Sequence, residues 1–361
     1  MKHAEPLIEA ISQRLESFVQ ERRTEAEAFG DEALLMVDHA AAALRGGKRL
    51  RARLCAAGWR AAGGPGVDPA PEHLIAAASA LEVFQAAALV HDDLIDNADT
   101  RRGRPSGHRA LEAAHAGAAW RGDAEAFGRS AALLVGDLLV AWSDDLLEWA
   151  LERSPATAAT ARSEYALMRR EVTMGQFLDI AEESAWSTAD EAELAERALR
   201  IASLKSARYS VQQPLVIGAA LAGADAEQLE ALRRIGHPLG MAFQLRDDVL
   251  GVFGDARETG KPAGDDLREG KRTVLVALAR TALAADARRV FDTQVGAPGL
   301  DERQVEELAG IIRDTGALER VERMIDDYTD EADRAMAASP FDDAAIDALR
   351  ELARAATRRT A

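Results

Sequence analysis

Apolar side chains recur at the period of about 3.6 residues that is typical of amphipathic α-helices, along almost the whole alanine-rich chain. Alternating runs of Val, Ile and Thr, which would indicate strands, are missing from the sequence. The longest candidate loops, Gly63 to Pro71 and Phe253 to Gly270, are short and have the helical pattern on both sides. The sequence therefore predicts an all-α fold with many helices, in which residues 1–361 form a single domain.

Two of these apolar stretches contain aspartate clusters, one with Asp92, Asp93 and Asp96 and the other with Asp247 and Asp248. Carboxylates in apolar surroundings are costly unless a cation compensates for their charge. Because positions i and i+4 share a helix face, Asp92 and Asp96 can reach a common ion, whereas Asp93 points partly away. Oxygen ligands without Cys or His favour Mg²⁺, or Mn²⁺, over zinc. The clusters therefore predict a magnesium site.

The alternative for either cluster alone is the solvated end of an amphipathic helix. The segment from Leu81 to Val90, before the first cluster, is too apolar for a surface face, and the existence of a second cluster weakens this alternative further. Two other aspartate pairs lack such surroundings. Asp144 and Asp145 are predicted to be solvated, and Asp265 and Asp266 lie in a Gly-rich loop.

Composition and charge limit the possible partners and the compartment. With 48% hydrophobic residues the chain can bury a sizeable core, and its formal charge of −17 disfavours nucleic acid as a partner. The single cysteine, Cys55, cannot form an internal disulfide and is expected to be a buried, inert thiol, as in the reducing cytoplasm. Residues Met1 to Phe29 are too charged for a signal peptide, and no apolar run is expected to reach the ~20 residues of a transmembrane segment.

Basic residues are concentrated in a few segments despite the negative total charge. Gly46 to Arg51 places two glycines before three cations that are expected to open a helix, and helix starts bind anions readily. Arg101 to Pro105 follows the first acidic cluster, and guanidinium groups suit phosphate oxygens. Lys205 interrupts an apolar segment, and further lysines follow the second cluster. Acids and bases thus recur together, as a metal-bridged phosphate site requires.

These segments also follow a characteristic order along the chain. The order is GGKRLR, HDDLIDNADTRRGRPS, GQFLD, KSA, FQLRDDVLGVFGD and GKPAGDDLREGKRT. In this order the chain resembles the trans-isoprenyl diphosphate synthase (polyprenyl synthetase) family. The resemblance implies a helical bundle around a deep central cavity, a homodimer, and an enzyme that condenses an allylic diphosphate with isopentenyl diphosphate.

The resemblance also implies roles for individual residues. Mg²⁺ that bridges the allylic diphosphate would be bound by three aspartates, with Asp93 and Asp248 as further catalytic residues: Asp92, Asp96 and Asp247. The allylic diphosphate would be held by five side chains, of which the first lysine is also catalytic: Arg101, Lys205, Gln244, Lys261 and Lys271. Isopentenyl diphosphate would be held by four others: Lys48, Arg51, Gln85 and Arg102. A GQxxD element resembles a second wall of the metal site and contributes Gln176 and Asp179.

Two positions depart from the family pattern. Gln85 replaces a histidine that is common in bacterial members, although glutamine still donates a hydrogen bond. At the fifth position of the second cluster, where most relatives have aspartate, this chain has Gly251. Asp255 could fold back toward the metal and replace the missing ligand, or Asp247 and Asp248 could suffice.

The residues before the first acidic cluster indicate the length of the product. In the family, the side chains four and five positions before it face the cavity, and large ones stop chain growth. Here they are Ala88 and Ala87, and Phe84, about 12 Å from Asp92 along a helix, could form a lower floor. We therefore expect geranylgeranyl diphosphate as the product, with longer polyprenyl diphosphates as the alternative.

Other function classes share part of these features. A class I terpene cyclase also uses DDxxD, but its second motif begins with Asn and contains Ser or Thr and Glu, which Asp247 to Gly251 lacks. A head-to-head prenyl synthase would have two DxxED-type motifs, and neither cluster matches. An inactive partner subunit would fit Gly251, but such subunits tend to lose the first acidic motif or its arginines.

Overall fold

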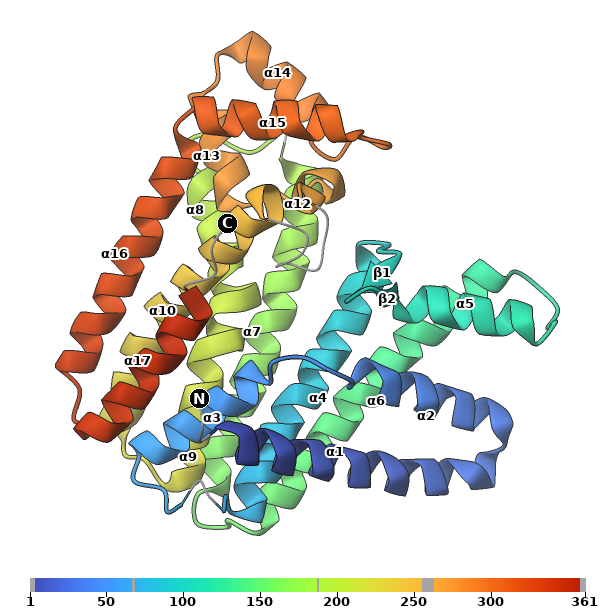
Figure 1. Cartoon of the computed structure of the whole chain (residues 1–361), viewed down its shortest axis with the longest axis vertical. Coiled ribbons are helices and arrows are strands. Elements are labelled where there is room, and N and C mark those ends of the chain that lie inside the picture. Colours follow the sequence, from blue (N-terminus) through green and yellow to red (C-terminus); the bar gives the residue numbers. More distant parts are fainter. Residues whose placement is uncertain (1–3, 67–68, 187, 255–262, 358–361) are drawn as a thin grey trace. The chain divides into compact units, whose positions relative to one another are not determined.

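The computed structural model describes residues 4–66, 69–186, 188–254 and 263–357 (Figure 1). Within these residues the chain forms helices joined by short connections, with one antiparallel pair of two-residue strands. The predicted all-α fold is therefore confirmed. Asp255 and Lys261, for which the sequence predicts roles, lie outside the described residues.

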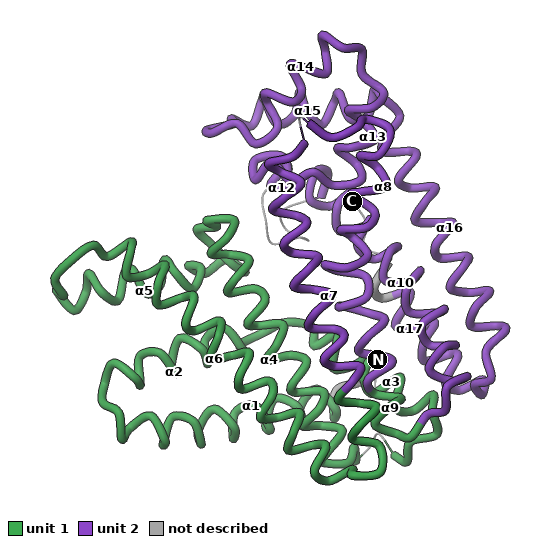
Figure 2. Tube along the Cα trace, turned by 180° about the vertical axis from the view of Figure 1, so that it is seen from behind, with its two compact units in different colours: residues 1–162, 218–223 green, residues 163–217, 224–361 purple. Residues whose placement is uncertain are grey.

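The chain divides into two compact units, and each is described by itself here (Figure 2). Unit 1 contains residues 1–162 and 218–223, and unit 2 contains residues 163–217 and 224–361. Two of the three boundaries fall inside helices, α7 (Ala158–Ala185) and α9 (Gln213–Ala222), and the third follows the end of α9. The prediction that residues 1–361 form a single domain stays a prediction.

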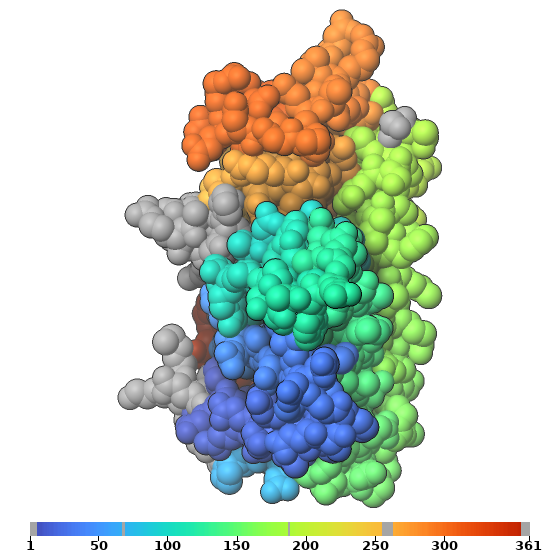
Figure 3. All heavy atoms as spheres, turned by 90° about the vertical axis from the view of Figure 1, so that its right-hand side faces the viewer, coloured from blue at the N-terminus to red at the C-terminus, as the bar shows by residue number. Residues whose placement is uncertain are grey.

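Unit 1 contains helices from the first part of the chain and the strand pair. Its elements are α1 (Ala4–Ala26), η1 (Glu27–Phe29), α2 (Asp31–Ala43), α3 (Leu50–Ala61), α4 (Glu72–Ile95), β1 (Thr100–Arg101), β2 (Arg104–Pro105), α5 (Gly107–Gly117) and α6 (Ala124–Glu152). Helix α4 packs against α1, α3, α5 and α6, while α2 and α5 lie next to each other on one face of the unit (Figure 3). Helix α4 is thus the centre of unit 1.

Helix α4 is apolar on almost all sides because other helices surround it. Its 24 residues are long and apolar enough to cross a membrane by length and composition, so the expectation that no segment reaches this length was wrong. However, 72% of its apolar window is buried inside the protein, as in the core helix of a globular fold. Cys55, on α3, is also buried as predicted, and this burial raises the pKa of its thiol to about 12.

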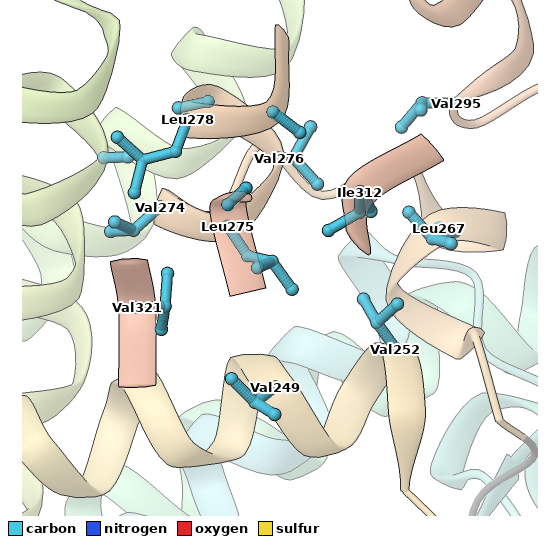
Figure 4. Packing of buried hydrophobic residues seen from close by; sticks show 14 of the residues in the cluster. Val249, Val252, Leu267, Val274, Leu275, Val276, Leu278, Val295, Ile312 and Val321 are labelled. Carbon is cyan, nitrogen blue, oxygen red and sulfur yellow. The ribbon is translucent and has the colours of Figure 1, made fainter. Parts of the chain in front are cut away.

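Unit 2 contains the helices of the second part of the chain and a hydrophobic core at the end of one of the long helices. Its elements are α8 (Leu194–Ile201), η2 (Ala202–Gln212), α10 (Ala226–Phe253), α12 (Asp265–Glu269), α13 (Val274–Ala282), α14 (Ala285–Gln294), α15 (Glu302–Asp314), α16 (Ala317–Ala337) and α17 (Asp343–Thr357). In its core, Val249 and Val252 of α10 pack with Leu267 of α12, Ile312 of α15 and Val321 of α16 (Figure 4). This core holds the last turns of α10, which carry the second acidic cluster.

Helix η2 is an 11-residue π-helix, in which the backbone is wider than in an α-helix. Glycines on both neighbouring helices make room for it. A Cβ atom at Gly175 of α7 would lie 2.7 Å from Lys205 Cα, and one at Gly240 of α10 would lie 2.8 Å from Ala207 Cα. The two glycines therefore permit a close approach that fixes the backbone around Lys205.

Candidate active site

The first acidic cluster lies in the last turn of α4. Asp92 is half-buried, and Asp96 directly follows the helix, where its backbone N–H donates a hydrogen bond to the Asp92 carbonyl oxygen (2.8 Å). Asp96 is also half-buried, one turn after Asp92. The Asp93 side chain does not share this accessible face, since it is only 4% exposed. The i, i+4 spacing thus presents Asp92 and Asp96 on one partly accessible face, as the sequence predicts.

Arginines on the short hairpin after α4 approach this cluster. Arg102 and Gly103, between β1 and β2, both have positive φ angles (52° and 70°), as the central residues of a type I′ turn require. Arg101 Nε donates a hydrogen bond to Asp93 Oδ1 (2.7 Å), and Arg101 Nη2 lies 3.6 Å from Asp92 Oδ2. Asp93 therefore positions the guanidinium of Arg101 beside the accessible carboxylate.

The next arginine of the hairpin reaches the Gly-rich segment before α3. Arg102 Nη1 donates a hydrogen bond to the carbonyl oxygen of Arg45 (3.1 Å), and its Nη2 would lie 3.1 Å from a Cβ atom at Gly47. Gly47, with a φ angle of 89°, makes room for this guanidinium. Helix α3 begins only at Leu50, so of the three cations expected to open the helix only Arg51 lies in its first turn, while Lys48 and Arg49 precede it.

Glu82 was missed in the sequence, although it organises this region. Its side chain is buried on α4, one turn before Gln85, and its Oε1 accepts a hydrogen bond from the Ala52 N–H in the first turn of α3 (3.0 Å). Arg49 Nη1 lies 3.6 Å from the other carboxylate oxygen. Glu82 thereby fixes the start of the helix that carries Arg51. A carboxylate inside an apolar segment was the available signal.

Positive charge is concentrated around Arg102. Burial lowers the pKa of the Arg102 guanidinium, and the neighbouring Arg101, Arg49 and Arg104 lower it further, while Glu82 opposes them. Mutual repulsion among these cations is relieved when an anion binds between them. The part of unit 1 around the hairpin and the Gly-rich segment is therefore suited to a phosphate group.

The second acidic cluster lies near the end of α10, in unit 2. Asp248 is buried, and Gln244 Nε2 donates a hydrogen bond to its Oδ1 (2.7 Å). Burial raises the pKa of the Asp248 carboxyl well above its usual range, and the charges of Asp266, Asp247 and Asp179 raise it further, while the hydrogen bond from Gln244 lowers it. Asp247 is half-buried. The accessible carboxylate of this pair is therefore Asp247, while Gln244 holds Asp248.

Gly251, which departs from the family pattern, contacts an aspartate from another helix. A Cβ atom at this position would lie 3.0 Å from Asp266 Oδ1 and would overlap Oδ2. The sequence predicts a Gly-rich loop for Asp265 and Asp266, but α12 is a short helix that brings Asp266 against the end of α10. That expectation was wrong, because the contact depends on packing between helices and not on local spacing.

Two predicted residues of unit 2 form an ion pair across helices. Lys205 Nζ of η2 lies 2.5 Å from Asp179 Oδ2 of α7, and both side chains are mostly buried. Gln176, one turn before Asp179, has a buried Nε2 atom without a hydrogen-bond partner among the described residues. Lys271 Nζ pairs with Glu269 (2.5 Å) and lies 4.0 Å from Asp266 Oδ1. Lysines and carboxylates thus alternate here as the sequence predicts.

The three residues predicted to set product length differ in their surroundings. Ala88 is half-buried, and it lies one turn before Asp92 on the same partly accessible face as Gln85. Ala87 is fully buried and Phe84 is 7% exposed. Of the two alanines, only Ala88 therefore shares the face of the acidic cluster.

The donor set fits Mg²⁺. Among the described residues, no group of three or more His, Cys, Asp or Glu side chains forms a metal site by itself. Mg²⁺ is usually bound through one or two carboxylates together with waters and substrate phosphates. Asp92 with Asp96 in unit 1, and Asp247 in unit 2, provide such carboxylates, and Arg101 lies beside Asp92.

The model of the polyprenyl synthetase family matches residues 35–312. The chain belongs to the polyprenyl synthetase family. It is 33% identical to the geranylfarnesyl diphosphate synthase of Aeropyrum pernix over 304 residues, which cover 83% of this chain and 86% of that protein. It is 30% identical to the geranylgeranyl diphosphate synthase of Mycobacterium tuberculosis, over 80% of this chain and 75% of that protein.

Comparison with a solved structure supports the same family assignment. The crystal structure of geranylgeranyl pyrophosphate synthase from Corynebacterium glutamicum, complexed with isoprenyl diphosphate and magnesium, has a TM-score of 0.91 to this chain. The two proteins are 39% identical, with 98% of this chain and 99% of that chain covered. This polyprenyl synthetase is therefore an enzyme of the trans-prenyltransferase class, as the sequence predicts.

Proposed function

We propose that the protein condenses isopentenyl diphosphate with an allylic diphosphate (dimethylallyl, geranyl or farnesyl) and releases geranylgeranyl diphosphate. The observation that carries this proposal is the partly accessible face of α4. It presents Asp92 and Asp96, with Arg101 beside Asp92 and the small side chain of Ala88 one turn before Asp92. A diphosphate would bind at the acidic end of this face, and the isoprenoid chain would lie along Ala88.

The allylic diphosphate would be bound through Mg²⁺ and by basic side chains. Asp92, Asp96 and Asp247 would hold Mg²⁺, with Mn²⁺ as a substitute, and the metal would neutralise the negative charge that develops on the departing diphosphate. Arg101, oriented by Asp93, would contact the diphosphate from the hairpin. The predicted binding set also includes Lys205, Gln244, Lys261 and Lys271, and the predicted catalytic set includes Asp248.

Isopentenyl diphosphate would be bound by the second group of cations in unit 1. Arg102 lies against the Gly-rich segment that leads to Lys48, and the Glu82 contact with α3 positions the helix of Arg51. Gln85 follows Glu82 by one turn on α4. The predicted set of Lys48, Arg51, Gln85 and Arg102 is supported by these contacts, because they concentrate positive charge around one segment.

Within the bound complex, these residues would promote ionisation and protect its product. Basic side chains aimed at the leaving diphosphate favour cleavage of its C–O bond, which leaves an allylic cation. The double bond of isopentenyl diphosphate would then attack this cation, and a proton would pass to the departing diphosphate. Apolar residues of α4, including Phe84 and Ala88, would keep water away from the cation.

The small side chain of Ala88 favours a product longer than farnesyl diphosphate. Phe84, one turn further from Asp92, is the large side chain that would limit the product near twenty carbons. The similar proteins from Mycobacterium tuberculosis and Corynebacterium glutamicum are called geranylgeranyl diphosphate synthases, which supports this length. The relative from Aeropyrum pernix is a geranylfarnesyl diphosphate synthase, so a somewhat longer product is the main alternative.

A direct test is to incubate the protein with Mg²⁺, labelled isopentenyl diphosphate and each allylic diphosphate in turn, and to size the products. We expect geranylgeranyl diphosphate from every accepted starter. A product of more than twenty carbons would show a longer-chain synthase, and a cyclised hydrocarbon would show a terpene cyclase. No product from any starter would support an inactive partner subunit.

The assembly and the cellular location are part of the same proposal. Leu133 and Leu134 of α6 are exposed, at 49% and 55%, and adjacent exposed leucines on one helix suit a protein interface. We therefore propose a homodimer in the cytoplasm, built from single-domain protomers. Size-exclusion chromatography with light scattering would test the dimer.

A further inference from the structure

We propose that Asp266 supplies, from α12, the carboxylate that the second acidic cluster lacks at Gly251, and that Asp266 takes part with Asp247 in holding divalent metal. This inference rests on the proposed function, because it assigns a further residue to the metal site of that reaction. It replaces the two alternatives left by the sequence, in which either Asp255 replaces the missing ligand or Asp247 and Asp248 suffice without it.

The positions of Gly251 and Asp266 are complementary. Gly251 lies four residues after Asp247, on the same face of α10. A Cβ atom at position 251 would lie 3.0 Å from Asp266 Oδ1 and would overlap Oδ2. The Asp266 carboxylate thus occupies the space where an aspartate at position 251 would begin. A side chain at 251 and the carboxylate of Asp266 exclude one another there.

Packing holds Asp266 at this position. The next residue, Leu267, is fully buried and packs in the core with Val249 and Val252 of α10 (Figure 4). The carbonyl oxygen of Leu267 accepts a hydrogen bond from the Gly296 N–H (2.9 Å). Because the side chain and the carbonyl oxygen of the adjacent Leu267 are both anchored, the carboxylate of Asp266 is preorganised rather than placed by a loose loop.

The charges around Asp266 also favour a cation. Its side chain is 15% exposed, and Lys271 Nζ, 4.0 Å from Oδ1, is closer to Glu269 at 2.5 Å. Asp247 and Asp248 lie one turn before Gly251 on the adjacent helix. Carboxylate oxygens are the ligands that Mg²⁺ and Mn²⁺ prefer in proteins. A divalent ion on a bound diphosphate would be such a cation.

The test is a titration of Mn²⁺ into the full-length protein in the presence of inorganic diphosphate, followed by electron paramagnetic resonance. Asp266→Asn keeps the shape of the side chain and removes its charge. We expect it to raise the dissociation constant of Mn²⁺ by about tenfold or more, the range known for lost metal-site partners. The matched control is Asp265→Asn, which removes the neighbouring charge and should leave the constant unchanged.

A second set of variants, which moves the carboxylate from position 266 to position 251, makes the test stricter. Asp266→Ala should weaken Mn²⁺ binding, and adding Gly251→Asp to that variant should restore it, because the carboxylate returns to α10. Thermal unfolding of each variant identifies any that fail to fold, and Asp266→Asn, which changes no volume, then decides. Unchanged Mn²⁺ binding in Asp266→Asn, with weakened binding in Asp247→Ala, would overturn the role of Asp266 alone.

The proposed function can fail separately. A wild-type protein that binds Mn²⁺ and diphosphate but makes no prenyl product would contradict the function, while the effect of Asp266→Asn on Mn²⁺ binding would still support this inference. Unchanged Mn²⁺ binding in both Asp247→Ala and Asp266→Asn would overturn the inference together with the second metal-binding cluster.

Discussion

Arg101 Nε donates a hydrogen bond to the buried Oδ1 of Asp93 over 2.7 Å, and this pair ties the hairpin to the last turn of α4. Asp93→Asn should lower the free energy of unfolding by about 2 kcal/mol, because a mostly buried guanidinium loses one of its charged partners. It should also raise the KM for the allylic diphosphate, since Arg101 is no longer oriented. Urea denaturation and steady-state kinetics measure the two effects.

The control for this pair is Asp99→Asn, which removes an exposed partner of Arg109. Exposed ion pairs contribute about 0–1 kcal/mol, so this variant should be close to wild type in stability and KM. Equal effects of the two substitutions would contradict a special role for Asp93.

Removal of the accessible carboxylates should abolish most activity without unfolding the protein. Asp92→Ala and Asp247→Ala should each lower turnover by roughly two or more orders of magnitude, because the charge on the leaving diphosphate is no longer compensated. Asp145→Ala, on an exposed part of α6, should leave turnover unchanged. Circular dichroism checks the fold, and near-normal turnover in either active-site variant would reject the assignment.

Product length should respond to Ala88 but not in the same way to Ala87. Ala88 is half-buried on the face of Asp92, so Ala88→Phe should shorten the product while the enzyme stays active. Ala87 is fully buried, so Ala87→Phe should overpack unit 1 and destabilise it by about 1–3 kcal/mol. Product sizing and thermal unfolding separate the two. An unchanged product in Ala88→Phe would mean that another helix limits growth.

The local part of this site could be predicted from the sequence. The spacing of Asp92 and Asp96 fixes a shared helix face, and Asp93 is turned away by the same geometry. The 3.6-residue period gave the all-α fold. The apolar length of α4 was underestimated, since a helix surrounded by other helices on all sides needs no polar face.

The parts that could not be predicted depend on contacts between distant segments. Glu82 contacts Ala52 from another helix, and Asp266 reaches Gly251 because Leu267 enters the core of unit 2. Neither contact has a fixed spacing in the sequence. Position 251 was recognised as unusual, but a missing side chain does not indicate which residue fills its place.

The buried Asp248 should make stability depend on pH in the metal-free protein. Its pKa is raised, chiefly by burial, so the folded state binds the proton more tightly than the unfolded state. Stability is therefore lost as pH rises from the usual aspartate pKa toward the raised one. Asp248→Asn mimics the protonated form and should gain stability over wild type across this window, by at most about 1.4 kcal/mol per pH unit. Urea denaturation in a chelator from pH 4 to pH 8 would show a pH-independent difference if this were wrong.

The close contact between Gly175 and the π-helix should connect helix packing to Lys205. Gly175→Ala places a Cβ atom 2.7 Å from Lys205 Cα, so the two helices must separate, at a cost of about 1–3 kcal/mol in stability. Lys205 would then move away from Asp179, and turnover should fall. Gly310 of α15 has no atom within 4 Å of its Cβ position, so Gly310→Ala should instead stabilise the protein by about 0.5–1 kcal/mol without affecting turnover. If both variants gained stability, the glycine at 175 would not be required by the π-helix.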